Sequence, residues 1–426
     1  MLNFLKTVFS LIALFLILAE PSRSNSTFRV ILPTDDPGMI SGAQPMERNL
    51  TSLDSQATKS TILALKPWAN GYWAMELGLT GNRYRDPGFA AKGSWPSRFE
   101  YIKKNSLQNV LLQTDSKKRA RLIDQLSPAE KYDLLVGDAE ATLTSAQWAE
   151  GQRYYQDGTL ANWMGICEGT AAASVMFPEP KRSLELFSPQ GDKIQFQETD
   201  IKGLAALLWS SYNLTVPVTG TRCSSRNPER RNGVVIDESC FNTNPGAFHI
   251  ALLNLLGKRK QVLFMNRVSN QEVWNVPIIA YKTQYHSPNK NHGNKDLQQA
   301  VLPIAQVDQD EFTSLRSAQT AFVVGVQTTV KFGTGVITQA TYDYDLEMDI
   351  NGIIIGGEWH SSSHPDFLWT VENGFRPVTI GDNQLGNQVW NDTKIPAEWL
   401  RAARLSSQNN QPLELIVSEL VRRSSK

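Results

Sequence analysis

The strongest constraint on the fold is a stretch of strict alternation in the second half of the chain. Between residues 321 and 359, an apolar set alternates with an acidic set: Tyr344, Leu346, Met348 and Ile350 against Asp343, Asp345, Glu347 and Asp349. Successive side chains of a strand point to opposite faces, so this pattern predicts antiparallel strands with one apolar face. We expect the acidic row to face solvent. The alternative is that it attracts an amine substrate or a cation.

Turn and helix signals complete the outline of the fold. Asn351-Gly352 predicts a two-residue hairpin turn, and the apolar runs at residues 249–256 and 262–265 predict a second hairpin. Ser127 and Glu130, with a proline between them, form a capping box and predict a helix start. Further helical patterns occupy residues 107–156, 200–212, 396–405 and 412–423. Helices followed by antiparallel strands favour an α+β fold.

The N-terminal residues have the pattern of an export signal. Lys6 precedes an apolar stretch at residues 7–19 that is too short to span a bilayer. We expect residues 1–24 to be a signal peptide, and the alternative is an uncleaved membrane anchor. We expect the mature chain to be secreted or periplasmic, with no membrane segment. Residues 25–62 are predicted to be a loosely structured leader. Residues 63–383 are predicted to form the main domain, which is β-rich from about residue 321, and residues 384–426 a C-terminal helical segment.

Charge gives no indication of a nucleic-acid partner. Lysine plus arginine and aspartate plus glutamate number 42 each, so the net charge is zero. No loop shows the regular acidic spacing with a central glycine that a dedicated calcium site uses. We therefore expect no metal and no cofactor.

The three cysteines differ in their surroundings. Cys223 and Cys240 flank a polar, turn-rich stretch that a disulfide would close as a loop. In an oxidising compartment an odd count leaves one thiol unpaired, and that thiol is then Cys167. A buried structural thiol is the alternative interpretation of Cys167.

Cys167 has the surroundings of a nucleophile. Gly165 and Gly169 bracket it, and three alanines at residues 171–173 follow, which predicts a loop leading into a small-residue helix. The unpaired N–H groups of a helix start lower the pKa of a cysteine there and can bind an oxyanion. Papain-like enzymes and transglutaminases use such a loop-to-helix nucleophile.

His249 is the predicted base. It opens an expected apolar strand, and Asn266 ends the next one, where its amide would orient the imidazole. His364, beside Asp366, is the competing base, and a core histidine bonded to backbone is the remaining alternative.

Six segments in matching order resemble the transglutaminase elicitor family, the cell-wall transglutaminases of oomycetes and their marine bacterial relatives. The segments are LSPAEKYDLLVGD at 126–138, WMGIC at 163–167, DIKGL at 200–204, PGAFH at 245–249, EVWNVP at 272–277 with Lys282, and GGEW at 356–359 followed by HPDFLW at 364–369. Two positions depart from the family pattern. Thr170 stands where relatives have tryptophan, and Asn266 stands where an aspartate is expected.

The resemblance implies a papain- or transglutaminase-like fold and a protein-glutamine γ-glutamyltransferase. Cys167 would attack a glutamine side-chain amide, release ammonia and pass the acyl group to a lysine amine. The expected partners are proteins that present glutamine and lysine side chains, such as cell-wall or surface proteins. Such a site must exclude water. Trp163, Trp274 and Trp359 are predicted to wall the substrate tunnel, with Asn162 as an oxyanion donor, although ordinary core packing explains tryptophans equally well.

Two alternatives remain open. A papain-like protease or amidase with the same residues would transfer the acyl group to water, and amine incorporation separates the two. A catalytically silent surface or recognition protein would keep the fold without turnover. The departure from the family pattern at Thr170 leaves this interpretation open.

Overall fold

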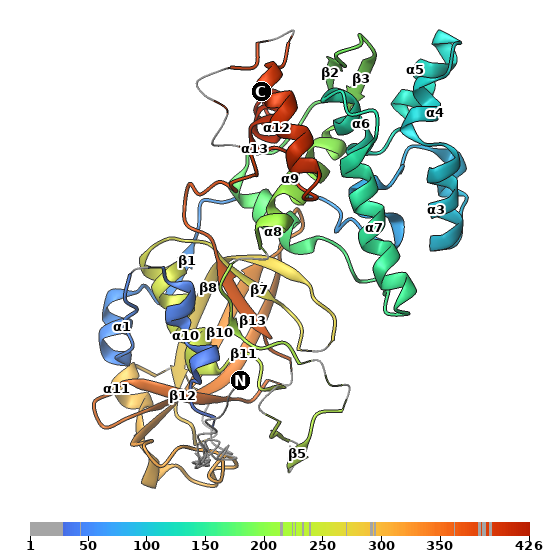
Figure 1. Cartoon of the computed structure of the whole chain (residues 1–426). Helices are drawn as coiled ribbons and strands as arrows, with labels where there is room; N and C mark the ends of the chain where they lie inside the picture. Colours follow the sequence, from blue (N-terminus) through green and yellow to red (C-terminus); the bar gives the residue numbers. More distant parts are fainter. Residues whose placement is uncertain are drawn as a thin grey trace, which may run out of the picture.

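The computed structural model describes residues 29–42, 44–213, 216–223, 225, 227–231, 234–237, 240–269, 271–289, 293, 295–361, 363–381, 385, 389–391 and 394–426. The predicted signal peptide lies outside these residues. The chain forms a helical part and a part built on a large antiparallel sheet (Figure 1), which confirms the expected α+β fold. Within the described ranges, no helix is both long and apolar enough to cross a membrane.

Most helices belong to the helical part, whereas α1, α10 and α11 lie beside the sheet (Figure 1). Their bounds are α1 Leu50–Gln56, α2 Pro87–Ala90, α3 Trp95–Lys104, α4 Leu107–Leu111, α5 Ser116–Asp124, α6 Pro128–Leu135, α7 Thr142–Gln156, α8 Cys167–Met176, α9 Glu198–Asn213, α10 Pro245–Ala251, α11 Leu297–Ala300, α12 Ala397–Ser407 and α13 Glu414–Ser424. The predicted capping box is present, because Ser127 and Glu130 each accept a backbone N–H of the other.

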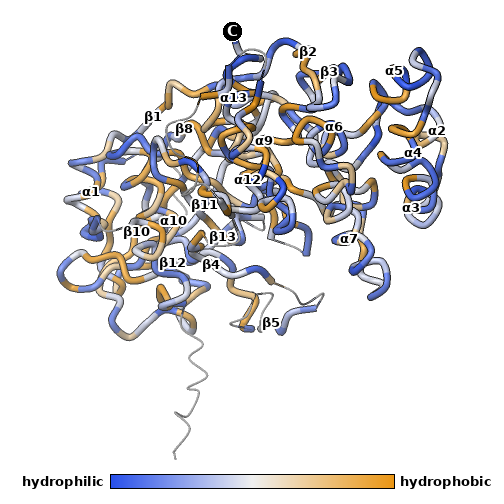
Figure 2. Tube along the Cα trace, turned by 45° about the horizontal axis from the view of Figure 1, so that its top comes forward, coloured by the Kyte–Doolittle hydropathy of each residue, from blue (hydrophilic) through white to orange (hydrophobic). Residues whose placement is uncertain are grey.

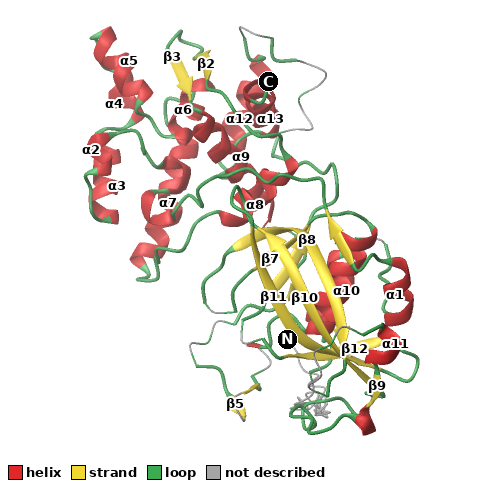
Figure 3. Ribbon diagram, turned by 180° about the vertical axis from the view of Figure 1, so that it is seen from behind, coloured by secondary structure: helices red, strands yellow, loops and turns green. Residues whose placement is uncertain are grey.

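The main sheet has the order β12-β11-β10-β8-β7-β13-β4, with β1 paired to β8 and β9 paired to β10. Its strands are β1 Ser60–Ile62, β4 Thr219–Gly220, β7 Leu263–Asn266, β8 Asn275–His286, β9 Leu302–Pro303, β10 Phe322–Phe332, β11 Thr338–Met348, β12 Ile354–Trp359 and β13 Phe367–Thr370. Two small hairpins stand apart: β2 Leu184–Phe187 with β3 Lys193–Phe196, and β5 Arg230–Arg231 with β6 Val234–Val235. Seen from behind, α8 lies over the ends of β7 and β8 (Figure 3).

The alternating segment forms β11 as far as Met348, but two residues of its acidic row are buried. Ile350, expected on the apolar face, lies beyond the strand and is 74% exposed. Asp345 and Glu347 are 2% and 1% exposed. Arg316 reaches over them from the loop before β10, with N···O distances of 2.7 Å to Asp345 and 3.2 Å to Glu347. The prediction of a solvated row is therefore wrong at these two positions, because alternation alone does not show that a charged loop will cover the second face.

The predicted strand at residues 249–256 is wrong. Asn244 accepts the N–H of Gly246 and Pro245 follows it, so this pair starts α10, which continues into a π-helix, Leu252–Lys258. The turn of the predicted hairpin would fall between residues 256 and 262, where that π-helix ends at Lys258. These helices are buried on every side, against β11 and β12 among others. An apolar run that is buried all round has no helical period to reveal it.

The predicted loose leader is also wrong where it is described. Val30 bridges to Gly356 at the edge of β12, and β1 pairs with β8. Arg29 forms an ion pair with Glu358 at 3.3 Å and donates a hydrogen bond to the carbonyl oxygen of Val235 at 2.6 Å. This segment is therefore part of the sheet, paired with it at Val30 and along β1.

The two C-terminal helices form where they were predicted. α13 packs against α9 and α12 against α7, so they belong to the helical part. Apolar residues gather in the interior of both parts (Figure 2).

Glu358 should make stability depend on pH. Burial raises the pKa of its carboxyl to about 8, although Arg29 acts to lower it. A group whose folded pKa exceeds its unfolded pKa contributes stability that is present at low pH and lost as the pH rises through the folded pKa. Between about pH 5 and about pH 9, the wild type should therefore lose up to about 4 kcal/mol relative to Glu358→Gln. Urea unfolding across this range measures the difference, and parallel pH profiles would contradict the burial argument.

Candidate active site

Cys167 is the first residue of α8, as the sequence predicted. Two glycines let this turn lie directly against neighbouring backbone. A Cβ atom on Gly165 would lie 2.4 Å from the carbonyl oxygen of Tyr72, and one on Gly169 would lie 2.0 Å from that of Ala206 in α9. No side chain fits at such distances. The bracketing glycines therefore fix the position of the thiol.

The sulfur faces the segment that leads into β8. The thiol donates to the carbonyl oxygen of Val273 at 3.4 Å, and Nδ2 of Asn275 donates to the sulfur at 3.9 Å. Nε1 of Trp369, in β13, donates to Oδ1 of Asn275 at 2.8 Å. The indole therefore fixes which side of the amide points at the sulfur.

Glu168 is the third group at the sulfur. Its Oε2 lies 3.7 Å from Sγ of Cys167, and its Oε1 accepts a hydrogen bond from the hydroxyl of Ser210 in α9 at 2.5 Å. Burial, followed by the charge of Glu168, raises the pKa of Cys167 to about 12. Burial also raises the pKa of Glu168. The predicted lowering of the thiol pKa by the helix start is therefore wrong, because desolvation and the adjacent carboxylate outweigh it.

His249 is not brought to the thiol. It is fully buried in α10, where Nδ1 lies 2.9 Å from the hydroxyl of Tyr344 and the ring lies 6.2 Å from that of Tyr285. Tyr285 lies near one end of β8, and Asn275, which contacts Cys167, is at the other. That length of strand spans about 30 Å at roughly 3.3 Å per residue. Burial lowers the pKa of His249 to about 3, so the imidazole is neutral.

Asn266 lies close to the nucleophile segment but does not orient His249. Its Oδ1 accepts the backbone N–H of Trp274 at 2.7 Å, and its Nδ2 donates to Asp366 at 3.0 Å. Burial raises the pKa of Asp366 to about 7. Asn266 is also the cross-strand partner of Asn275. The predicted triad of Cys167, His249 and Asn266 is therefore not assembled in this structure.

The competing base and one predicted tunnel residue lie together elsewhere. His364 stacks on Trp359 with ring centroids 5.0 Å apart, and burial lowers its pKa to about 4. Trp359 packs on Phe248 and donates its Nε1 hydrogen to the carbonyl oxygen of Thr243 at 2.8 Å. Trp359 is a core residue beneath α10, so its assignment to a tunnel wall is not supported by its position.

The other predicted aromatic residues lie near Cys167. The ring of Trp274 lies edge-on to that of Tyr72, with centroids 5.4 Å apart. The hydroxyl of Tyr72 donates to the backbone carbonyl of Asn162 at 2.8 Å, and its carbonyl accepts the N–H of the residue before Cys167. Trp163 lies under the guanidinium of Arg222, 5.2 Å from its ring centroid. These half-buried rings belong to the surroundings of the nucleophile.

The predicted disulfide between Cys223 and Cys240 is present, and it leaves Cys167 as the free thiol. Arg222, which rests on Trp163, precedes this disulfide directly. The disulfide therefore closes the loop that begins beside Trp163.

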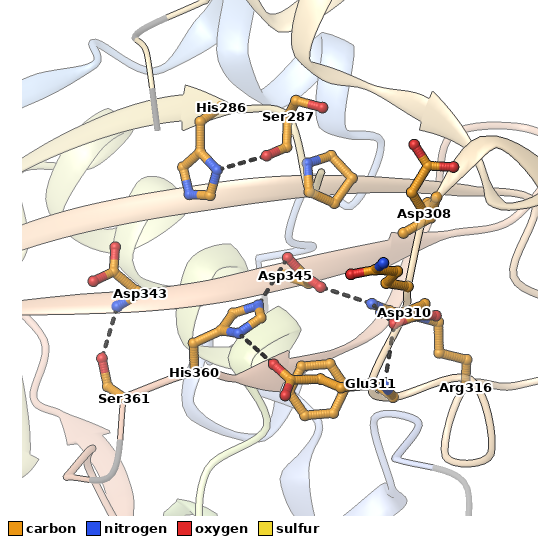
Figure 4. Close-up of a pocket in the computed structure, with 14 residues that line it drawn as sticks. His286, Ser287, Asp308, Asp310, Glu311, Arg316, Asp343, Asp345, His360 and Ser361 are labelled. Carbon is orange, nitrogen blue, oxygen red and sulfur yellow. Dashed lines mark hydrogen bonds and ion pairs between the residues drawn. The ribbon is translucent and has the colours of Figure 1, made fainter. Parts of the chain in front are cut away.

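A separate acidic cavity of about 590 Å³ lies on the covered face of β11 (Figure 4). His360 bridges its walls, with Nε2 3.1 Å from Asp345 and Nδ1 3.5 Å from Glu311. Arg316 neutralises Asp345 and Asp310. In the described part of the chain, no cluster of three or more histidine, cysteine or acidic residues is arranged to hold a metal ion.

Sequence reasoning missed Asn275, Glu168 and Ser210. Asn275 lies in one of the segments that carry the family resemblance, which was a usable signal. Ser210 carried none, because only the packing of α8 on α9 brings it to Glu168.

Comparison with known proteins agrees with the resemblance. The family model described as "Transglutaminase elicitor" matches residues 42–388. The crystal structure of the GP42 transglutaminase from Phytophthora sojae is similar in fold, with a TM-score of 0.52 and 19% sequence identity, over 90% of this chain and 94% of that chain. No curated protein matches the chain.

The position of His249 can be tested without an activity assay. His249→Gln should lower the free energy of unfolding by about 1–3 kcal/mol, because the Tyr344 hydroxyl loses one of its two buried partners and keeps only Thr328. It should leave the pH dependence of Cys167 alkylation by iodoacetamide unchanged, since no contact joins the imidazole to the thiol. Peptide mapping measures how much Cys167 is alkylated over time. A strong change in the alkylation rate of Cys167 would show that the imidazole does reach the sulfur.

Proposed function

Because the chain belongs to the transglutaminase elicitor family, we propose that it is a secreted protein-glutamine γ-glutamyltransferase with Cys167 as its nucleophile. One observation carries this proposal: the free thiol lies at the first residue of α8 and faces the amide of Asn275. Both residues lie inside the range that the family model matches.

The reaction is an acyl transfer in two steps. The sulfur of Cys167 attacks the carbonyl carbon of a glutamine side chain, and ammonia leaves as the thioester forms. A primary amine, such as that of a lysine, then attacks the thioester and releases the thiol. Splitting the exchange through a covalent intermediate replaces one difficult step by two easier ones.

The oxyanion of each tetrahedral intermediate would form beside fixed N–H donors. Backbone N–H groups at the start of a helix have no partner in its own hydrogen-bond ladder, and Nδ2 of Asn275 points at the sulfur. At the start of α8 the N–H of Glu168 bonds to the carboxylate of the same residue. Trp369 holds that amide in place. Donors arranged before the reaction stabilise developing charge without reorganisation.

Transfer to an amine rather than to water requires a dry site. The rings of Tyr72, Trp163 and Trp274 near the thiol support such a role. The substrates would be proteins that present glutamine and lysine side chains, such as cell-wall or surface proteins outside the exporting cell. If water reached the thioester instead, the same residues would act as an amidase.

A second candidate is a catalytically silent surface or recognition protein. Two observations favour it. Burial raises the pKa of Cys167 to about 12, and His249 packs on Tyr285, at the end of β8 away from Cys167. Measured turnover decides between the two candidates.

The assay is incorporation of a fluorescent primary amine into a glutamine donor, with ammonia release followed in parallel. Cys167→Ala should abolish both signals. Asn275→Ala should lower kcat by about 10²–10³-fold, the usual effect of losing one oxyanion donor. Asn289→Ala serves as the matched control, because it removes a half-buried amide beyond the far end of β8 that bonds to Gln306 and Asp308. Full activity in Cys167→Ala would exclude the cysteine enzyme, and ammonia release without amine incorporation would identify an amidase.

A further inference from the structure

We infer that Glu168 is the proton acceptor for Cys167 and that Ser210 positions it. This inference rests on the proposed function and adds a catalytic residue to it. Three groups contact the sulfur in the described structure: the carbonyl of Val273, the amide of Asn275 and the carboxylate of Glu168. Of these three groups, only the carboxylate is a base that can accept the thiol proton.

The geometry of Glu168 suits this role. One carboxylate oxygen, Oε2, lies 3.7 Å from the sulfur, while the other is held 2.5 Å from the hydroxyl of Ser210. The backbone contact at Gly169 locks α8 to α9 immediately beside this pair. The carboxylate is therefore held between the two helices with one oxygen toward the reacting atom.

Burial of the thiol makes such an acceptor necessary. A free thiolate is costly at this position, because burial raises the pKa of Cys167 to about 12. The proton must then leave as the sulfur–carbon bond forms. Burial also raises the pKa of Glu168, and a carboxylate with a raised pKa is a stronger general base.

The proton and electron movements balance. The S–H proton of Cys167 passes to Oε2 of Glu168 while the sulfur electron pair forms a bond to the glutamine carbonyl carbon. When the tetrahedral intermediate collapses, the C–N bond breaks and Glu168 returns the proton to the leaving nitrogen, which departs as ammonia. In the second step Glu168 takes a proton from the attacking amine, and the C–S bond breaks as that proton returns to the sulfur.

Glu168→Gln in the full mature chain tests the inference with two readouts that should move in opposite directions. The value of kcat for amine incorporation should fall by about 10²–10⁴-fold, because the general base is lost. Alkylation of Cys167 by iodoacetamide at a fixed pH should become faster, because the charge of Glu168 helps to raise the pKa of the thiol. Glu179→Gln is the matched control, since Glu179 pairs with Lys202 of α9 at 3.0 Å and does not touch the thiol.

Ser210→Ala provides a variant that keeps the carboxylate. Loss of the hydroxyl should raise the pKa of Glu168, since the hydrogen bond from Ser210 lowers it. The acidic limb of the kcat/KM profile should therefore move to higher pH, and Ser210→Thr should move it back. A purely structural role of Ser210 would change the unfolding midpoint and leave that limb in place.

The outcomes separate this inference from the proposed function. Turnover that depends on Cys167 but survives Glu168→Gln would overturn the role of Glu168 and leave the proposed function intact. Faster alkylation together with faster turnover would show that Glu168 only opposes the thiolate, which also overturns it. A wild-type chain without turnover that depends on Cys167 would overturn both.

Discussion

The helix that begins at Cys167 lies with its backbone almost in contact with α9, because Gly169 has no side chain. A Cβ atom at that position would lie 2.0 Å from the carbonyl oxygen of Ala206. This contact sets the depth of α8 between the helical part and the sheet. The thiol then faces Asn275 at the start of β8, and Glu168 meets Ser210 across the helix pair. A larger residue at 169 would separate all of these groups at once.

Desolvation makes a charged sulfur costly at this site, while the Cys167 side chain itself is half-buried. The pKa of Cys167 is raised to about 12, so the thiol is not a ready-made thiolate. A site of this kind generates its nucleophile during the reaction, and the groups in contact with the sulfur must stabilise the charges that appear. A distant imidazole contributes nothing to that task. The groups in position to act on the sulfur are therefore the carboxylate of Glu168 and the amide of Asn275, not a histidine.

The sequence predicted local features better than the partners of the nucleophile. Gly165 and Gly169 around the helix start and the capping box at Ser127 are encoded within a few residues, and each formed as expected. The alternation at residues 343–350 predicted the strand β11 but not the burial of its acidic face. The pairing of Cys223 with Cys240 was also predictable, because spacing and an odd cysteine count constrain it.

The errors share a physical cause. His249 lies in an apolar run that is buried on every side. The sequence pattern of such a run does not distinguish a strand from a helix. Once α10 replaced the expected strand, the imidazole pointed toward Tyr344 instead of the thiol. Ser210 and Arg316 act across long stretches of chain, through contacts that only tertiary packing creates.

The central claim is that Cys167 forms a covalent acyl intermediate. The wild-type chain would be mixed with a glutamine donor peptide without an amine acceptor and quenched in acid, and its intact mass would be measured. The account predicts a single adduct equal to the donor mass less one ammonia, on the peptide that contains Cys167, and no adduct on Cys167→Ala. Ammonia release without an adduct on that peptide, or the same adduct on Cys167→Ala, would contradict it.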